Sequence, residues 1–263
     1  MQTTELNIAI VQSDIIWENK QKNFESLETL LFHRQGYDLI VLPEMYSCGF
    51  SVNTDKCAEE AKGESFEWMC SLSKKTGAAV VASVPVKENG KIFNRFYFVM
   101  PDGHSYEYNK RHLFSYGGEH LLFSGGEDRL IFDYKGWKIL PMVCYDLRFP
   151  VWNSNRFVDG VYDYDLAICV ANWPQSRRHA WTTLLQARAI ENQAWMIAAN
   201  RVGVDGRELS YSGDSMVVNP YGEIVNTASQ IETILEARIS LEFLQSYRQK
   251  FAFANDWDKF ELL

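Results

Sequence analysis

In the stretch LPMVCYDLRFPVW, residues 140–152, an apolar run ends abruptly at a cysteine. The residues from Ile139 to Val143 are all apolar, and Cys144 is followed at once by Tyr-Asp-Leu-Arg. A short apolar run of this kind predicts a buried strand. Free cysteines usually behave as small buried hydrophobes, so the base rate favours a core position for Cys144. The alternative is that the strand holds a reactive thiol at its exposed end.

On both sides of this stretch, strand-like and helix-like segments alternate. We expect strands at 6–12, 38–43, 78–86, 92–100, 104–110, 137–144, 165–172, 195–200, 212–220 and 232–239. We expect helices at 19–33, 64–76, from Pro150 to about 158, at 177–194 and near 241–250. This alternation predicts an α/β protein in which helices cover sheets. With no linker or repeat, residues 1–263 form one expected domain. Its core covers about 5–240, and the tail at about 241–263 packs on the core or on a partner subunit.

The composition excludes several classes of protein. The 263 residues are 46% hydrophobic, and 26 basic against 34 acidic residues give a net charge of −8, which argues against nucleic-acid or anionic-membrane partners. The N-terminus lacks the basic start of a signal peptide, and no stretch approaches the ~18 apolar residues of a membrane span. We therefore expect a cytoplasmic protein.

The cysteines and histidines show no structural pattern of their own. Five cysteines are an odd number without a C-x-x-C pair, which fits neither a disulfide framework nor a zinc site. The histidines at 33, 104, 112, 120 and 179 lack the spacing of metal ligands. We expect free thiols, no metal and no cofactor.

Polar or reactive residues follow several of the predicted strands. Glu44 follows the strand at 38–43, Lys110 ends the one at 104–110, and Cys144 ends the one at 137–144. Asn172 and Trp173 stand at the end of the strand at 165–172. Functional groups of α/β proteins gather at the carboxyl ends of strands, so these positions are the candidates for a site.

A glutamate, a lysine and a cysteine supply a base, an electrophile and a nucleophile. Glu44 would remove the thiol proton of Cys144, and Lys110 would stabilise the oxyanion formed when the thiolate attacks a carbonyl. The backbone N–H of Tyr145, just past the nucleophile, would be the second oxyanion donor. Alternatively, Glu44 caps a turn and Lys110 is a solvated surface lysine. Spacing alone does not exclude these alternatives.

Several motifs together resemble the nitrilase superfamily of carbon–nitrogen hydrolases. They read LPEMYSCGF around Glu44, YNKRHLF around Lys110 and VCYDLRFPVW around Cys144. The likeness continues through ANWP, LLQARAIENQ, NRVG and YSGDSMVVNPYGEIV, so that it extends from about residue 5 to the tail. Within that superfamily, the chain resembles the bacterial omega-amidases.

This resemblance implies a four-layer α-β-β-α sandwich that usually pairs into dimers, so the expected partners are an amide substrate and further copies of the chain. It assigns Glu44 as general base, Lys110 as oxyanion donor and Cys144 as nucleophile. It also implies that Glu119, in YGGEHLLFSGG, positions the lysine and the substrate. One departure is Cys48, where the family pattern has a small hydroxylic residue.

The implied activity is that of an amidohydrolase acting on linear amide bonds. The omega-amidase resemblance implies hydrolysis of the side-chain amide of small 2-oxo dicarboxylic acid monoamides, namely 2-oxoglutaramate and 2-oxosuccinamate, through a cysteine thioester. An arginine should bind the substrate carboxylate, with Arg177, Arg148 and Arg178 as candidates in that order. On the family analogy, aromatic walls come from Tyr46, Phe114 and Trp173, although ordinary core packing would also account for these rings.

Three other functions stay open at this point. The first is hydrolysis of another short-chain aliphatic amide or an N-carbamoyl compound by an enzyme of the same superfamily. The second is a Cys–His hydrolase in which His112 or His179 is the base. The third is a scaffold or redox thiol protein without enzymatic activity, in which Cys144 forms no acyl adduct.

Overall fold

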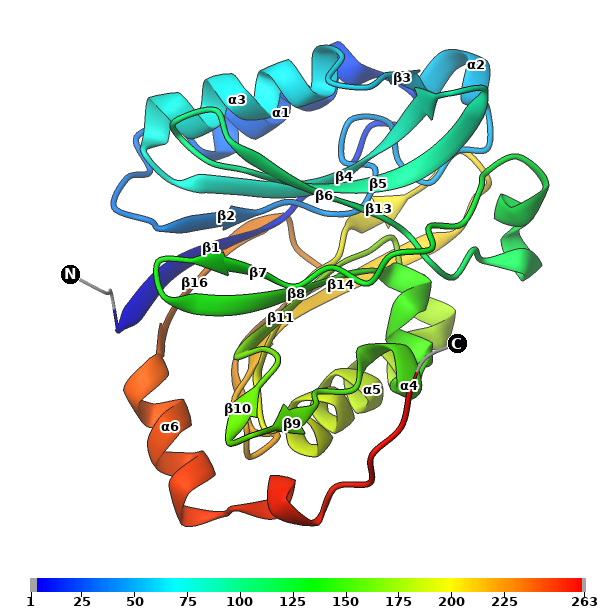
Figure 1. Cartoon of the computed structure of the whole chain (residues 1–263). Coiled ribbons are helices and arrows are strands. Elements are labelled where there is room, and N and C mark those ends of the chain that lie inside the picture. The colour runs from blue at the N-terminus through cyan, green and yellow to red at the C-terminus, as the bar shows by residue number, and fades with distance from the viewer. Residues whose placement is uncertain (1–3, 262–263) are drawn as a thin grey trace.

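Two seven-stranded sheets stack face to face in the computed structural model, which describes residues 4–261 (Figure 1). The strand order of the first sheet is β16 (Thr233–Ser240), β1 (Glu5–Gln12), β2 (Leu39–Val41), β4 (Ala79–Glu88), β5 (Lys91–Val99) and β6 (Ser105–Asn109), with β3 (Glu59–Glu60) beside β4. The order of the second is β13 (Val202–Val204), β14 (Ser210–Val218), β12 (Trp195–Ala199), β11 (Leu166–Val170), β8 (Trp137–Val143) and β7 (Phe132–Tyr134), with β15 (Ile224–Ser229) beside β14.

Alternation along the buried strands builds three apolar layers. In β1, Ile8 and Ile10 face the other sheet, whereas Ala9 and Val11 face the helices. The strand β8 divides in the same way, since Val143 faces the first sheet and its neighbour Met142 faces the opposite side. Both faces of these strands are buried, which explains why their sequences read as continuous apolar runs.

Helices close the two outer faces. Figure 1 shows α1 (Lys20–Leu30) and α3 (Glu64–Thr76) over the first sheet, and α5 (Arg178–Glu191) over the second. The other helices are α2 (Thr54–Cys57), α4 (Pro150–Asn153) and α6 (Leu241–Lys250). The 3₁₀ turns are η1 (Ser115–Gly117), η2 (Glu119–Leu121), η3 (Cys144–Arg148), η4 (Gln175–Arg177) and η5 (Phe253–Asp256). The predicted four-layer α-β-β-α sandwich is confirmed. No helix among the described residues combines the length and apolar character needed to cross a membrane.

The prediction of a helix from Pro150 to about 158 is wrong. The helix α4 stops at Asn153, and the chain then forms a two-stranded ribbon of β9 (Phe157–Val158) and β10 (Val161–Tyr162). The side chain of Asn155 donates to the Tyr164 carbonyl and accepts from the Tyr164 N–H. Asparagine side chains compete for backbone groups in this way, which ends a helix.

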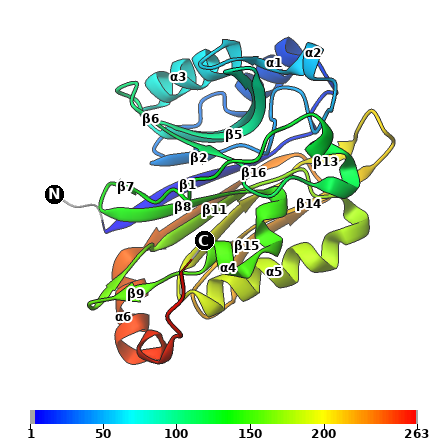
Figure 2. The ribbon, with the colours of Figure 1, turned by 45° about the vertical axis from the view of Figure 1, so that its right-hand side comes forward.

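Short strands were also missed, because their sequences carry little apolar alternation. The strand β15 is largely exposed and follows the Pro220-Tyr221-Gly222 turn as the partner of β14. Beyond α6, the tail runs back along the outer side of the second sheet toward α4 (Figures 1 and 2). There Trp257 meets the ring of Tyr162 edge-on at 5.8 Å, so the described part of the tail packs on its own chain. The last two tail residues lie outside the described range.

Candidate active site

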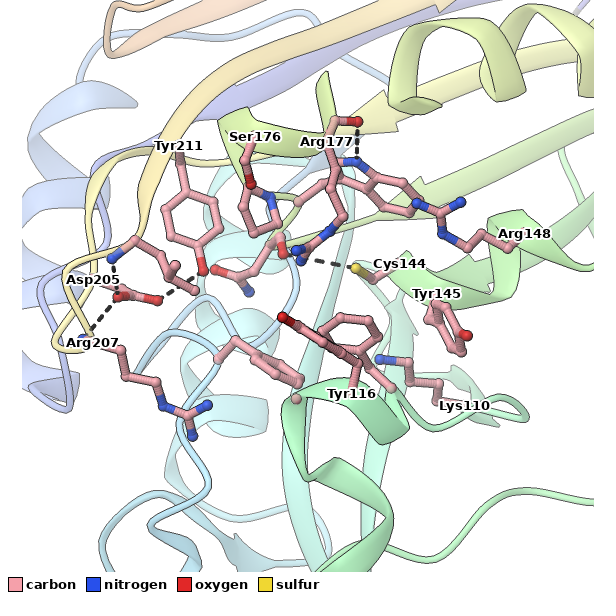
Figure 3. A pocket seen from close by; sticks show the side chains of 17 residues that line it. Lys110, Tyr116, Cys144, Tyr145, Arg148, Ser176, Arg177, Asp205, Arg207 and Tyr211 are labelled. Carbon is pink, nitrogen blue, oxygen red and sulfur yellow. Dashed lines mark hydrogen bonds between the residues drawn. The ribbon is translucent and has the colours of Figure 1, made fainter. Parts of the chain in front are cut away.

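The polar residues that follow the strands meet at one end of the sandwich. Glu44 comes after β2, Lys110 after β6 and Cys144 after β8, and the two sheets bring these strand ends together. The side chains of Glu44, Lys110 and Glu119 are fully buried. Cys144 opens the turn η3 and lies at the base of a cavity (Figure 3).

The Lys110 ammonium bridges two carboxylates. Its Nζ atom lies 3.0 Å from Glu44 Oε1 and 2.9 Å from Glu119 Oε2. From β5, Asn94 Nδ2 donates to Glu44 Oε1 at 2.7 Å and to Glu119 Oε1 at 3.1 Å. The remaining Glu44 oxygen, Oε2, accepts the backbone N–H of Asn172 at 2.8 Å. Both carboxylates and the ammonium of this network are therefore held by direct hydrogen bonds.

The charges of this network determine which of its groups are ionised. Burial alone would lower the pKa of Lys110, but the carboxylates of Glu119 and Glu44 outweigh it and raise that pKa. The lysine is therefore a fixed cation. Burial raises the pKa of Glu119, against the opposing charge of Lys110. Burial, followed by the charge of Glu44, raises the pKa of the Cys144 thiol well above its ordinary value.

The 3₁₀ turn η2 presents Glu119 to the lysine. The residue before it, Gly118, has a φ of +80°, a conformation that glycine adopts without steric cost. The Phe114 N–H donates to Glu119 Oε2 at 2.6 Å, which ties the start of the loop to the carboxylate at its end. One short loop thereby supplies both a buried carboxylate and an aromatic cavity wall.

Cys144 sits at a sharp change of backbone direction. Its φ is +47°, a left-handed conformation that non-glycine residues rarely adopt. Its Sγ atom lies 3.8 Å from the backbone oxygen of Asn172. The N–H of Tyr145 lies in the first turn of η3, where backbone donors have no partner within the helix. Such a donor beside a strained cysteine has the arrangement of a nucleophile elbow.

A cavity of about 320 Å³ lies over Cys144, Lys110 and Asn172. Its other lining residues are Phe50, Phe114, Tyr116, Gly117, Tyr145, Arg148, Trp173, Pro174, Ser176, Arg177, Asp205, Arg207, Leu209 and Tyr211. This size suits a small organic molecule. The cavity therefore combines an apolar wall with a few cationic groups beside a thiol.

Two half-buried arginines in this cavity stack on its aromatic walls. The guanidinium of Arg148 lies 4.8 Å from the ring centre of Trp173, and that of Arg177 lies 5.1 Å from the ring centre of Phe114. Within residues 4–261, neither guanidinium forms an ion pair with an acidic side chain. Both hydrogen-bonding edges are therefore free for a ligand (Figure 3).

Two of the residues predicted to bind substrate lie elsewhere. The hydroxyl of Tyr46 donates to the Ser65 carbonyl at 2.6 Å, and its ring packs on Phe24 and Trp68 beneath the outer helices. The prediction that Tyr46 forms a cavity wall is therefore wrong. Arg178 pairs with Asp214 at 2.7 Å and does not line the cavity. The prediction that Arg178 is a candidate for binding the substrate carboxylate is therefore also wrong.

Other cavity residues were missed from the sequence. Asp205, Arg207 and Tyr211 come from the β13–β14 hairpin. Asp205 accepts the Arg207 N–H at 2.8 Å and the Tyr211 hydroxyl at 2.8 Å, which shapes this hairpin at the cavity mouth. No motif marks these residues, because only the pairing of the two strands brings them to the site.

The histidines proposed as alternative bases have other environments. His112 Nδ1 lies 2.8 Å from Asp146 Oδ1, and its ring stacks on Phe149 with 3.7 Å between ring centres. His179 is exposed on α5. Neither lines the cavity, whereas the buried carboxylate of Glu44 is close enough to Cys144 for its charge to raise the pKa of the thiol.

Comparison with known proteins agrees with this geometry. A profile described as "Carbon-nitrogen hydrolase" matches residues 7–249. The chain is 43% identical to "Omega-amidase YafV" of Yersinia enterocolitica, covering 98% of this chain and 99% of the relative. It is 31% identical to "2-oxoglutaramate amidase" of Bacillus subtilis, covering 95% and 96%.

A solved structure extends the likeness to three dimensions. XC1258 from Xanthomonas campestris, described as a CN-hydrolase superfamily protein with an arsenic adduct in the active site, is 41% identical. The superposition has a TM-score of 0.97 and covers 99% of this chain and all of the other. The present chain therefore belongs to the carbon–nitrogen hydrolase family of the nitrilase superfamily and is an amidohydrolase that acts on carbon–nitrogen bonds.

Proposed function

We propose that this protein is an omega-amidase that hydrolyses the side-chain amide of 2-oxoglutaramate and 2-oxosuccinamate to the acid and ammonia. The observation that carries this proposal is the placement, in the cavity that opens onto Cys144, of two arginines that form no ion pair with any residue of the described range. The names of the Yersinia and Bacillus relatives support the same substrate class.

In the first half of the reaction, Cys144 attacks the amide carbon. Glu44 accepts the thiol proton as the sulfur–carbon bond forms, because a thiol with a raised pKa needs a base beside it. The charge that develops on the carbonyl oxygen is stabilised by Lys110 and by the Tyr145 N–H. Collapse of the tetrahedral intermediate breaks the carbon–nitrogen bond, and Glu44 returns the proton to the leaving ammonia.

In the second half, water hydrolyses the thioester. Glu44 removes a proton from the water molecule as the oxygen attacks the acyl carbon, and the same two donors stabilise the second oxyanion. Collapse then releases the carboxylic acid, and the proton returns to the Cys144 sulfur. The complete burial of Glu44 supports this double role, since a base shielded from bulk water keeps its proton within the site.

Glu119 has a supporting role in this scheme. The Lys110 ammonium donates to the two carboxylate oxygens of Glu119 at 2.9 and 3.1 Å, and this holds it between Glu119 and Glu44. The second carboxylate thus keeps the lysine charged and oriented while Glu44 exchanges protons. Without it, proton uptake by Glu44 would leave a buried cation with no counter-ion, which is costly.

Recognition of the 2-oxo acid is assigned to Arg177 and Arg148. A carboxylate accepts charge-assisted, often bidentate hydrogen bonds from a guanidinium. Stacking on Phe114 and Trp173 leaves the edges of the two guanidinium groups free for such bonds. A neutral amide would leave them unmatched at a cost of about 1–3 kcal/mol.

The proposed function is tested by comparing 2-oxosuccinamate with butyramide, an amide that lacks the acid group. Ammonia release should show a kcat/KM that is roughly tenfold to a hundredfold higher for 2-oxosuccinamate. Mass spectrometry of acid-quenched enzyme should detect an acyl group on Cys144. Equal kcat/KM for both compounds would instead favour a general short-chain amidase.

A further inference from the structure

Asp146 is a fully buried carboxylate that none of the chemical steps above uses. It lies two residues after Cys144 and accepts four hydrogen bonds. Its Oδ2 atom accepts the Tyr108 hydroxyl at 2.9 Å and the Val143 N–H at 3.0 Å. Its Oδ1 atom lies 3.0 Å from the backbone nitrogen of His112 and 2.8 Å from the ring nitrogen Nδ1 of the same residue. Its acceptor capacity is therefore fully engaged.

The donors to this carboxylate flank both reacting groups. Val143 is the residue directly before Cys144, at the end of β8 in the second sheet. Tyr108 lies within β6 of the first sheet and His112 lies just after it, and each is two residues from Lys110, one on either side. A single side chain thereby connects the nucleophile of one sheet to the ammonium of the other.

Further contacts make this connection rigid. The Tyr108 hydroxyl accepts the Trp152 Nε1–H at 3.2 Å while donating to Asp146. Asn153 Nδ2 donates to the backbone oxygen of Asp146 at 2.7 Å. The aspartate is therefore held by its own main chain as well as by its side chain, and Tyr108 is held from two sides.

We propose that Asp146 is a positioning residue that sets the geometry of Cys144 relative to Lys110. The left-handed conformation of Cys144 persists only where the surroundings over-determine it, and Asp146 supplies contacts on both sides of the turn. A nucleophile displaced by about 1 Å from its oxyanion donors can lose roughly 100-fold in rate. This inference rests on the roles proposed above for Cys144 and Lys110.

The test is Asp146→Asn, which keeps the shape of the side chain. An amide offers one acceptor oxygen and two N–H donors, so one pair of contacts becomes donor against donor. We expect kcat to fall about 100-fold. The KM and the rate of Cys144 alkylation by iodoacetamide should stay near wild type, since neither needs the oxyanion geometry.

A matched control is Asp165→Asn. Asp165 is also a largely buried carboxylate, and it accepts the Lys138 N–H at 3.1 Å and Arg248 Nη1 at 2.6 Å, but it does not line the cavity. This variant should lose thermal stability while the folded enzyme keeps its kcat. A purely structural role for Asp146 predicts the same pattern for Asp146→Asn, and that result would overturn the proposal.

A second variant covers the case in which Asp146→Asn does not fold. Tyr108→Phe combined with His112→Phe removes the two side-chain donors but keeps both rings in place. It should lower kcat in the same direction, by a smaller factor, with KM and alkylation preserved. Wild-type kcat here would likewise overturn the proposal. Failure of the role proposed for Cys144 is recognised separately, as full activity in Cys144→Ser, and failure of the omega-amidase assignment as equal kcat/KM for 2-oxosuccinamate and butyramide.

Discussion

The floor and the rim of the cavity are built on different principles. The floor consists of Lys110 and Cys144, which line the cavity, together with Glu44 and Glu119, whose buried carboxylates hold the Lys110 ammonium but do not line the cavity themselves. The rim consists of Phe114, Tyr116, Arg148, Arg177 and Arg207, and it comes from loops and 3₁₀ turns. The contrast is clearest in exposure, since Lys110 is fully buried whereas Tyr116 is 88% exposed.

In the mechanism proposed above, this difference separates chemistry from specificity. Sheet register sets the floor, because each of Glu44, Lys110 and Cys144 follows a strand whose partners are paired over several residues. Loops tolerate substitution better than strands, so substitutions in the rim can change the substrate preference without altering the reaction. Substitutions in the floor should therefore affect every amide, and those in the rim should affect only some.

The largest effect is expected from Cys144→Ser. A serine hydroxyl is a much weaker acid than a thiol, so a carboxylate base cannot activate it in the same way. Ammonia release from 2-oxosuccinamate and from butyramide should both fall below detection, while circular dichroism shows an intact fold. Substantial turnover in this variant would rule out the covalent mechanism.

The second largest effect is expected when two adjacent cations, Lys110 and Arg111, are each replaced by alanine. Lys110→Ala removes a proposed oxyanion donor and should lower kcat by ~100- to 1000-fold for both amides. Arg111→Ala should have little effect, because its side chain donates to the Gly126 carbonyl and stacks on Trp152 outside the cavity. Rates should be corrected for the folded fraction. Small and equal losses of kcat at both positions would show that Lys110 does not stabilise the oxyanion.

The resting state of the floor can be tested through pH. Because burial and then Glu44 raise the pKa of Cys144, its thiolate should be scarce at neutral pH and increase as pH rises. Alkylation of Cys144 by iodoacetamide should therefore increase about tenfold per pH unit from pH 7 to 9. Peptide mass spectrometry measures this rate, and a plateau below pH 8 would contradict the assigned pKa direction.

A smaller and more selective effect is expected at the rim. Arg177→Ala should lower kcat/KM for 2-oxosuccinamate by roughly tenfold to a hundredfold and leave butyramide unaffected. Arg148→Ala should act in the same direction. The matched control is Arg178→Ala, since that arginine pairs with Asp214 outside the cavity. An equal loss of kcat/KM for both amides would indicate that Arg177 contributes to the chemical steps and not to recognition of the carboxylate.

Short-range patterns predicted helices that cover sheets and the positions of Glu44, Lys110 and Cys144 at strand ends, and the family resemblance added the four-layer arrangement. The helix at 64–76 has the predicted bounds, and apolar runs mark the strands that carry Glu44 and Cys144. The resemblance added Glu119, whose role no spacing rule would assign. What local patterns cannot show is which side chains meet through tertiary structure, as Asn94 and Glu119 do across 25 positions.

The rim was less predictable, because its composition depends on hairpins and on turns. Arg207 reaches the cavity only because β13 pairs with β14. The mistaken placement of Tyr46 has a local cause, since the intervening Met45 has a φ of +45° and the chain turns sharply after Glu44. Proximity in sequence to Glu44 therefore did not place Tyr46 in the cavity.

The smallest effect on activity is expected from Tyr46→Phe, which tests whether this ring belongs to the rim at all. Its hydroxyl donates to the Ser65 carbonyl within a fully buried contact, so the substitution removes one buried hydrogen bond worth about 1 kcal/mol. In a chain of this length, that loss lowers Tm by roughly 2–4 °C. The kcat/KM should stay at the wild-type value for both amides, because the ring packs on Phe24 and Trp68 and lines no part of the cavity. Calorimetry and ammonia release measure the two quantities independently. A selective loss of kcat/KM for 2-oxosuccinamate without a loss of stability would show that Tyr46 belongs to the rim, and that closeness to Glu44 in sequence does place a residue beside the substrate.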